Sequence, residues 1–236
     1  MRFYNRESEI DILRENEKLA ERSATFTVLT GRRRVGKTSL VTKAFEGRDY
    51  AYLFVSKDHE AVLCRKFQQA TEEQLGIRVY GRLTSFRDFF EVVMRESLHR
   101  HFTIVFDEFQ NLYKVNQAIF SEIQDLWDRY HRDSHLNLIT MGSIRSLMKR
   151  IFEDENEPLY GRPISKFTLQ PFTTRVLKQI FHDHKPDYKD EDLLCLYMLT
   201  GFVSIRPKIA VGINFSSAFR TIEVYRIALC RKDSIS

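Results

Sequence analysis

The chain has 236 residues, of which 43% are hydrophobic and 29% charged, with a formal net charge of +5 and a pI near 9.1. This composition is enough for a proper core and excludes global disorder, and the mild positive charge permits a nucleic-acid partner without arguing for one. No run of 18 apolar residues occurs and the N-terminus is charged throughout, so we expect a cytoplasmic protein with neither a membrane span nor a signal peptide. Three scattered cysteines, Cys64, Cys195 and Cys230, indicate a reducing compartment rather than a disulfide or zinc framework.

The chain is expected to begin with an amphipathic helix over about 6–20, with Asn5 as its cap. A β-branched and aromatic run over 25–29 then predicts a buried strand, which stops at Gly31. A purely structural role for the helix over 6–20 would be packing at the edge of a sheet.

A phosphate-loop pattern, G-x-x-x-x-G-K-[ST], follows this strand, and its fixed positions are Gly31, Gly36, Lys37 and Thr38. In this pattern backbone N–H groups close around phosphates, the lysine reaches the β and γ phosphates, and the threonine hydroxyl binds Mg²⁺. A helix expected from Thr38 adds the positive end of its dipole. In the variable positions 32–34, one arginine would help to neutralise phosphate and the others would be solvated. The alternative is an ordinary turn rich in Gly and Arg.

Strands and helices alternate after the loop, which predicts an α/β fold with a doubly wound parallel sheet of about five strands. Further strands are expected at 50–55, 102–106, 136–141 and 164–169, and helices at 38–45, 58–75, 85–98, 115–131 and 144–152. The aromatic residues of 85–98 have helical spacing and favour core packing over a base-stacking platform. Helices at about 173–182 and 190–199 would form a small lid, whose completeness the sequence leaves open.

Two acidic residues, Asp107 and Glu108, end the strand over 102–106. At the carboxyl end of a parallel strand, Asp107 would hold Mg²⁺ through water, and Glu108 would orient and deprotonate an attacking water. Such a pair alone is a weak signal, because many strands end at solvated carboxylates. About seventy residues after a phosphate loop it becomes specific.

Gly142 and Ser143 follow the strand over 136–141. A polar residue there would lie between the loop and Mg²⁺ and contact the γ-phosphate or the water. Capping of the helix over 144–152 is an equal alternative for Ser143 and does not exclude the first.

Several segments, taken in order, resemble the archaeal and bacterial ATPases of the STAND type, relatives of the AAA+ and origin-recognition ATPases. They cover residues 1 to about 200 and are Phe3-x-Asn5-Arg6-Glu7, Gly31 to Ser39, Phe106 to Gln110, Gly142-Ser143, Pro158 to Arg162, and Leu169-x-Pro171-Phe172. The resemblance implies a P-loop ATPase that uses ATP and Mg²⁺.

The same resemblance assigns roles to individual residues. It implies that Thr38 and Asp107 hold Mg²⁺, Glu108 is the catalytic base, Ser143 senses the γ-phosphate, and the Asn5-Arg6 segment lies by the adenine. It also implies that Arg162 acts as an arginine finger or sensor, whereas from the residues alone Arg162 is a turn residue. The residues implied to surround the phosphates are Gly31, Arg32, Arg33, Arg34, Val35, Gly36, Lys37, Thr38 and Ser39.

Three regions are expected: the ATPase domain over 1–170, a partial helical lid over 171–201, and an atypical tail over 202–236. Similar proteins have a second glycine after Gly201 and continue into a winged helix, but here Phe202 follows and the tail lacks clean periodicity. The hypotheses are a truncated relative or a coding frame altered after Gly201, with a tail that is disordered or frame-altered.

The leading functional hypothesis is Mg²⁺-dependent ATP hydrolysis that drives a conformational switch, with ATP and a homo-oligomer or partner protein as partners. The alternative is an ATP-gated adaptor or nucleic-acid-associated module with little turnover, for which no clear nucleic-acid motif is present. A small-molecule kinase is the third hypothesis, and the Asp-Glu pair disfavours it because it favours water as the acceptor.

Overall fold

The structure is a computed structural model that describes residues 4–79, 81–184 and 189. It divides into two compact units, one of Arg6–Gln170 and one of Met1–Asn5 with Pro171–Ser236. The described part of the second unit holds one helix, α8 (Thr174–His184). Its bounds are close to those of the first expected lid helix, 173–182. The expected helix over 190–199 and the tail over 202–236 lie outside the described residues.

The larger unit contains a five-stranded, all-parallel sheet in the order β2-β3-β4-β1-β5. This confirms the predicted α/β fold with a parallel sheet. The strands are β1 (Thr25–Thr30), β2 (Tyr50–Phe54), β3 (Phe102–Asp107), β4 (Leu136–Gly142) and β5 (Ser165–Thr168). The helices are α1 (Glu7–Ala20), α2 (Lys37–Ala44), α3 (Glu60–Leu75), α4 (Phe86–Glu96), η1 (Phe109–Asn111), α5 (Leu112–Val115), α6 (Ala118–Tyr130) and α7 (Arg145–Glu153).

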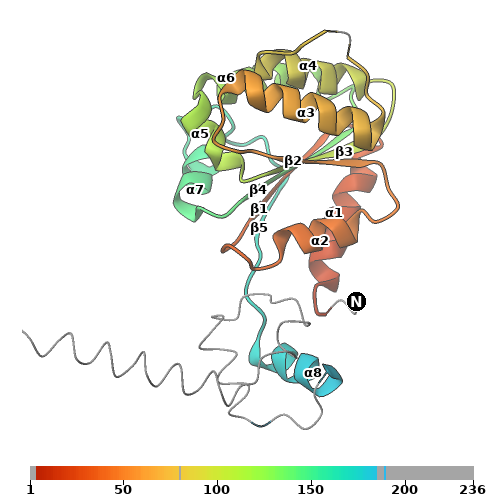
Figure 1. Cartoon of the computed structure of the whole chain (residues 1–236), viewed down its shortest axis with the longest axis vertical. Coiled ribbons are helices and arrows are strands. Elements are labelled where there is room, and N and C mark those ends of the chain that lie inside the picture. The colour runs from red at the N-terminus through yellow and green to blue at the C-terminus, as the bar shows by residue number, and fades with distance from the viewer. Residues whose placement is uncertain (1–3, 80, 185–188, 190–236) are drawn as a thin grey trace, which may run out of the picture. The chain divides into compact units, whose positions relative to one another are not determined.

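Helices cover both faces of this sheet, so it is doubly wound (Figure 1). α1 and α2 lie on one face, and α3, α4 and α6 lie on the other. From β1 the chain crosses to the edge strand β2 by way of α2. It then returns across the sheet through β3, β4 and β5, and the helices that connect these strands lie on the opposite face. Because the direction of travel reverses, right-handed crossovers require this change of face.

The core on the α3 side is largely aromatic. Its fully buried rings include Phe67, Phe86, Phe89, Phe106 and Phe109. Most neighbouring rings meet tilted or edge to face, with centroids 5.4–6.3 Å apart, which adds about 0.5–1.5 kcal/mol for each pair beyond the buried area. The aromatic stripe of α4 is therefore core, as its spacing predicted.

A row of polar side chains crosses the three central strands, β1, β4 and β3, near their amino ends. Thr25, Asn137 and Thr103 are register partners on β1, β4 and β3 and are 3% exposed or less. Thr25 Oγ1 donates to Asn137 Oδ1 at 3.1 Å, and Asn137 Nδ2 donates to Thr103 Oγ1 at 3.0 Å. Asn16 of α1 joins the row, because its backbone O lies 3.1 Å from Thr25 Oγ1, and its Nδ2 also donates to Thr27 Oγ1 at 2.9 Å. The row fixes α1 on the sheet, because each of these buried groups needs its partner.

Two local expectations differ from the structure. The helix expected over 115–131 begins three residues later, as α6, because Asn116 is extended and its Oδ1 accepts from Ala118 N at 3.0 Å, and the short helix α5 before it was not expected. Asn5 does not cap α1: the cap position is Arg6, it makes no side-chain cap bond, and Asn5 itself has a φ of 46°. By contrast, Ser85 caps α4 by accepting from Asp88 N at 3.1 Å, and Gly76 ends α3 in a left-handed conformation.

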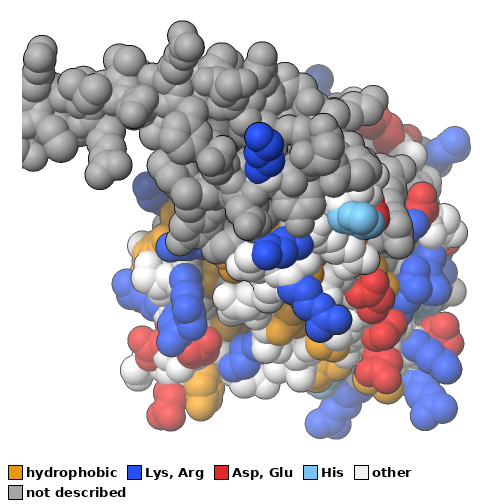
Figure 2. Space-filling view, turned by 90° about the horizontal axis from the view of Figure 1, so that it is seen from below, with side chains coloured by type: hydrophobic (Ala, Val, Ile, Leu, Met, Phe, Trp, Pro, Cys, Tyr) orange, Lys and Arg blue, Asp and Glu red, His pale blue; other side chains and the backbone are white. Residues whose placement is uncertain are grey.

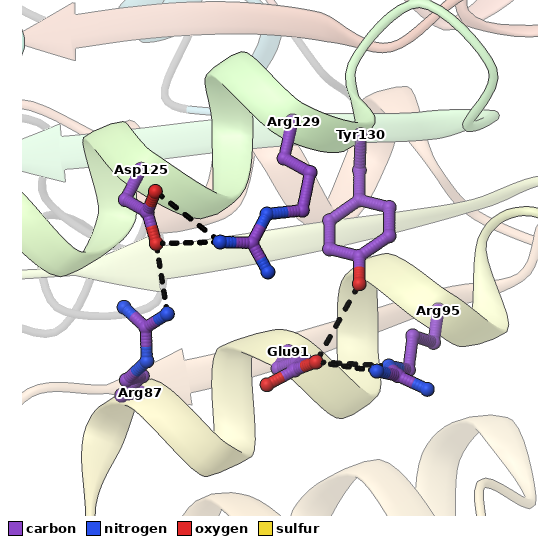
Figure 3. A network of polar contacts seen from close by, with 6 residues as sticks. All are labelled: Arg87, Glu91, Arg95, Asp125, Arg129 and Tyr130. Atoms are coloured by element: carbon purple, nitrogen blue, oxygen red, sulfur yellow. Dashed lines mark hydrogen bonds and ion pairs between the residues drawn. The ribbon is translucent and has the colours of Figure 1, made fainter.

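Charged side chains on the outer surface connect α4 to α6 (Figure 3). Arg87 Nη2 of α4 lies 2.8 Å from Asp125 Oδ2 of α6, and Asp125 also pairs with Arg129. Tyr130 Oη donates to Glu91 Oε1 at 3.5 Å. Exposed pairs of this kind contribute about 0–1 kcal/mol each, so the buried row is the larger polar contribution.

We expect Asn137→Ala to lower the free energy of unfolding by about 2 kcal/mol or more, because it leaves a buried threonine hydroxyl without its partner and opens a cavity. Arg87→Ala, the matched surface control, should cost under about 1 kcal/mol. Urea unfolding of the two variants measures the difference, and equal losses would contradict the importance of the buried row.

Candidate functional site

The candidate site lies at the carboxyl edge of the sheet. After β1 the chain turns to the α2 face, whereas after β3 and β4 it turns to the opposite face. Neighbouring strands whose connections diverge in this way leave a crevice beyond their carboxyl ends, where ligands bind in open α/β sheets. The phosphate loop, the Asp107–Glu108 pair and Gly142-Ser143 follow these three strands.

The phosphate loop curls around the ammonium group of Lys37. Lys37 Nζ donates to Gly31 O at 2.9 Å and to Arg32 O at 3.3 Å. Arg34 and Gly36 have left-handed φ values of 65° and 102°, a backbone geometry that points N–H groups into a concave anion site. Burial lowers the pKa of Lys37, and the carboxylates of the Asp107–Glu108 pair partly oppose that shift. A bound phosphate would compensate this buried positive charge.

The first turn of α2 faces the same loop. Its cap residue is Gly36, no side chain caps its N–H groups, and no acidic residue lies in the first turn. Such a helix end attracts anions through both its N–H groups and its dipole. Thr38 and Ser39 are exposed, as are the three arginines of positions 32–34, while Val35 is 1% exposed. The loop therefore offers both backbone donors and positive charge.

Gly31 is tightly enclosed. A Cβ atom at this position would lie 3.0 Å from Leu169 O and 3.0 Å from Val35 Cγ1. Real Cβ atoms rarely come this close to a neighbour, so a side chain here requires the loop or the chain after β5 to shift.

Hard oxygen ligands lie side by side at the start of α2 and the end of β3. Thr38 Oγ1 lies 3.5 Å from Asp107 Oδ2, and Asp107 Oδ1 accepts from Glu108 N at 2.8 Å. Tyr52 of β2 also donates a short hydrogen bond to Asp107 Oδ2. A hydroxyl and one carboxylate beside a phosphate site fit Mg²⁺, which is commonly bound by one or two carboxylates together with phosphates and waters.

Glu108 is held in a strained conformation with its carboxylate fixed. Its φ of 55° and ψ of 39° are left-handed, which costs of order 1–3 kcal/mol for a residue with a side chain. Ser143 Oγ donates to Glu108 Oε2 at 2.6 Å, and Gln110 Nε2 donates to the same oxygen. No described residue donates to Oε1, so that oxygen is the one available to a water molecule.

Ser143 does not cap the following helix. The cap position of α7 is Ile144, and the Ser143 hydroxyl is directed to Glu108 instead. The expected capping role of Ser143 is therefore absent, and its hydroxyl lies beside the carboxylate of Glu108.

Gln110 was not singled out from the sequence, although it belongs to the segment 106–110. It is 1% exposed, and its Oε1 has no hydrogen-bond partner among the described residues. Its amide nitrogen must face the Glu108 carboxylate, so the orphaned oxygen costs about 1–3 kcal/mol. Gly142 lies against this side chain: a Cβ there would be 2.6 Å from Gln110 Oε1 and 2.3 Å from Met148 Sδ.

Arg6 lies at the carboxyl edge of the sheet. Arg6 Nη2 donates to Gln170 O, and Leu169 N donates to Thr30 O at 2.7 Å, which places this segment beside the end of β1. Asn5 belongs to the other unit.

Arg162 lies at the amino edge, away from the other site residues. Arg162 Nη2 is 2.8 Å from Asp128 Oδ2, and Ile164 N donates to Phe26 O at the start of β1. The strand between Phe26 and Gly31 separates Arg162 from its own phosphate loop by about 17 Å.

Other observations concern metal clusters, thiol reactivity, membrane spans and surface charge. No group of three or more His, Cys, Asp or Glu side chains gathers as a metal cluster in the described residues. Burial raises the pKa of the Cys64 thiol to about 12, so this cysteine does not have a reactive thiolate. Within the described ranges no helix has the length and apolarity needed to cross a membrane. Figure 2 shows basic and acidic side chains interspersed on the visible face rather than gathered by sign.

Residues 3–202 match the family described as an ATPase domain predominantly from Archaea. The chain belongs to this family. An uncharacterized protein of Methanocaldococcus jannaschii, MJECL04, is 29% identical over 179 residues, which are 76% of this chain and 38% of that protein. This chain thus spans less than half the length of that relative.

Solved structures share the fold. The Walker-type ATPase PABY2304 of Pyrococcus abyssi has a TM-score of 0.66 at 21% identity, over 98% of this chain and 77% of that one. The ORC1 protein of Aeropyrum pernix, solved in complex with DNA, has a TM-score of 0.60 at 18% identity, over 84% and 55%. The resemblance to origin-recognition-like P-loop ATPases is therefore confirmed. At these identities the likeness concerns the fold.

We expect Gly142→Ala to lower the free energy of unfolding by about 1–3 kcal/mol, because the new methyl group overlaps Met148 and Gln110. In a Met148→Ala background the same change should cost clearly less, since two of the three clashing atoms are removed. A double-mutant cycle by urea unfolding measures this coupling. Additivity within about 0.5 kcal/mol would show that the Met148 contact is not what makes Gly142 necessary.

Proposed function

We propose that this ATPase domain binds ATP with Mg²⁺ and hydrolyses it to drive a conformational switch. One observation carries the proposal: the same edge of the sheet combines the Lys37 loop, the Thr38–Asp107 oxygen pair, and Glu108, whose Oε1 accepts no hydrogen bond from a described residue. The loop suits the phosphates, the oxygen pair suits Mg²⁺, and Glu108 suits a water molecule. Family membership supports ATP as the nucleotide.

In this mechanism the protein acts mainly by positioning charge. Lys37 and the N–H groups at the start of α2 bind the β and γ phosphates and stabilise the charge that develops on them. Mg²⁺, when bound, would neutralise phosphate charge, with Thr38 and Asp107 as the residues that hold it. Glu108 Oε1 orients the attacking water and accepts its proton, while Oε2 stays engaged by Gln110.

The switch is proposed to act through the single proton of the Ser143 hydroxyl. That proton is now donated to Glu108 Oε2 at 2.6 Å. If Ser143 donates to a γ-phosphate, it must release Glu108, because a hydroxyl has one donor hydrogen. The ends of β3 and β4 would then differ between the triphosphate and diphosphate forms, and this difference is what the switch would report.

We expect two variants to separate binding from hydrolysis. Lys37→Ala should weaken nucleotide binding by roughly 30-fold or more, because truncating one partner of a buried charge pair costs about 2–5 kcal/mol. Glu108→Gln should still bind ATP but lose roughly 10²–10⁴ in kcat, the usual contribution of a general base. Fluorescent-nucleotide titration and phosphate release measure the two effects.

The outcomes distinguish the hypotheses. Full ATPase activity in Glu108→Gln would show that the base is assigned wrongly. Tight binding by the unaltered chain with no turnover would favour the alternative, an ATP-gated adaptor. Salt-dependent binding of duplex DNA would favour its nucleic-acid-associated form.

We propose that Arg162 acts on a second copy of the chain. It cannot reach its own phosphate loop, because it lies at the amino edge and pairs with Asp128. An arginine finger supplied in trans is an established arrangement in phosphoryl transfer. The Asp128 pair would have to open when copies assemble.

We expect a mixture of Arg162→Ala and Lys37→Ala chains to hydrolyse ATP at least ~10-fold faster than either variant alone. Each Arg162→Ala site keeps its lysine and would receive Arg162 from the neighbouring Lys37→Ala chain. Phosphate release at equal total protein concentration measures this complementation. A mixture no faster than its components would leave Arg162 as the residue that anchors the turn before β5 to Asp128.

A further inference from the structure

The edge strand β2 contributes Tyr52 to the proposed magnesium site. β2 is an edge strand, and Tyr52 pairs in register with Val105 of β3. Asp107 lies two residues further along β3, and aromatic side chains can reach such a diagonal neighbour. The Tyr52 hydroxyl donates to Asp107 Oδ2 and lies 3.4 Å from Thr38 Oγ1. It therefore stands between the two residues that we expect to hold Mg²⁺.

The backbone holds Tyr52 firmly in this place. On the open side of the edge strand, Tyr52 N donates to Gln74 Oε1 of α3 at 2.9 Å. At the end of the strand, Val55 N donates to Asp107 O at 2.9 Å, and Asn111 Nδ2 donates to Val55 O at 2.8 Å. Three hydrogen bonds thus fix β2 beside the acidic pair, and the half-buried phenol is part of the built site.

We propose that Tyr52 is a positioning residue of the magnesium site, an inference that rests on the proposed function. Its hydroxyl hydrogen orients Asp107, and its oxygen lone pairs remain able to accept a hydrogen bond. Mg²⁺ usually keeps several of its waters, and the hydrogens of those waters need acceptors. Asp107 and Tyr52 would together present such acceptors beside the oxygens of Thr38 and Asp107 that would hold the ion.

Loss of the Tyr52 hydroxyl is expected to lower the affinity for Mg²⁺ rather than the affinity for the nucleotide. Groups that orient a metal's ligands typically change metal affinity by 10–100-fold when they are removed. Among the described hydrogen bonds, Tyr52 contacts the phosphate loop only through the Thr38 hydroxyl, which we expect to hold the ion. Nucleotide binding without the ion should therefore not depend on the Tyr52 hydroxyl. A purely structural tyrosine would affect both kinds of binding together.

The test uses the full 236-residue chain and a fluorescent ATP analogue. Its dissociation constant is measured in EDTA and then during a MgCl₂ titration, which gives the Mg²⁺ concentration at half effect. For Tyr52→Phe we expect this midpoint to rise about 10-fold while the dissociation constant in EDTA stays unchanged. Tyr50→Phe is the matched control, because Tyr50 lies on the same face of β2 and its ring contacts Phe45, with centroids 6.0 Å apart.

Each other outcome overturns the inference. An unchanged midpoint would show that the hydroxyl does not support the ion, and a lower midpoint would show that it competes with the ion. Loss of binding in EDTA as well would indicate a structural role. If the unaltered chain shows no nucleotide binding with or without Mg²⁺, the proposed function itself fails, and this arm is measured first.

Discussion

The parallel register of β1, β4 and β3 is the constraint on which the site depends. Thr30 pairs with Gly142, and Phe106 pairs with Thr140. The residues that follow these strands therefore emerge at nearly the same level of the sheet. A shift of one residue in either pairing would move a whole strand end by about 3.3 Å and turn its side chains to the other face. The buried row of Thr25, Asn137 and Thr103 resists such a shift, because it satisfies its hydrogen bonds in one register only.

Three unfavourable local features lie at this edge, although buried polar atoms without a partner among the described residues, such as Glu122 Oε2 and Ser134 Oγ, also lie elsewhere. Glu108 is strained, Gln110 has a buried oxygen with no partner among the described residues, and Lys37 is a buried ammonium group with a lowered pKa. Each feature lowers stability by itself, and each also directs a functional group into the crevice. Local rules of structure are commonly broken at functional sites and obeyed elsewhere. Their common location argues for one site rather than three unrelated defects.

Local sequence patterns predicted most of the fold. Alternation of short apolar strands with amphipathic helices was sufficient for the parallel sheet, and the expected helices over 58–75 and 85–98 correspond to α3 and α4. The expected helix over 115–131 began three residues too early because the apolar spacing continues across the extended Asn116, and the capping role of Asn5 was wrong because Arg6 is the cap position. Lys37, Thr38, Asp107, Glu108 and Ser143 could be named from the sequence because each belongs to a contiguous motif whose residue types indicate a chemistry.

Tyr52 and Gln110 could not be found in this way, because their contacts depend on register and packing. In the sequence, Tyr52 is one aromatic residue of an alternating strand, and Gln110 is a polar residue after an acidic pair. Only the pairing of β2 with β3 brings the phenol to Asp107, and only the packing of η1 against β4 places the Gln110 side chain, which bonds to Glu108, against Gly142. Arg162 shows another case: the family resemblance implies an arginine finger or sensor, and its place at the amino edge follows from the direction of β5, which no short motif states. The proposed action of Arg162 on the phosphates therefore requires a second copy of the chain, because the length of β1 separates the two edges within one copy.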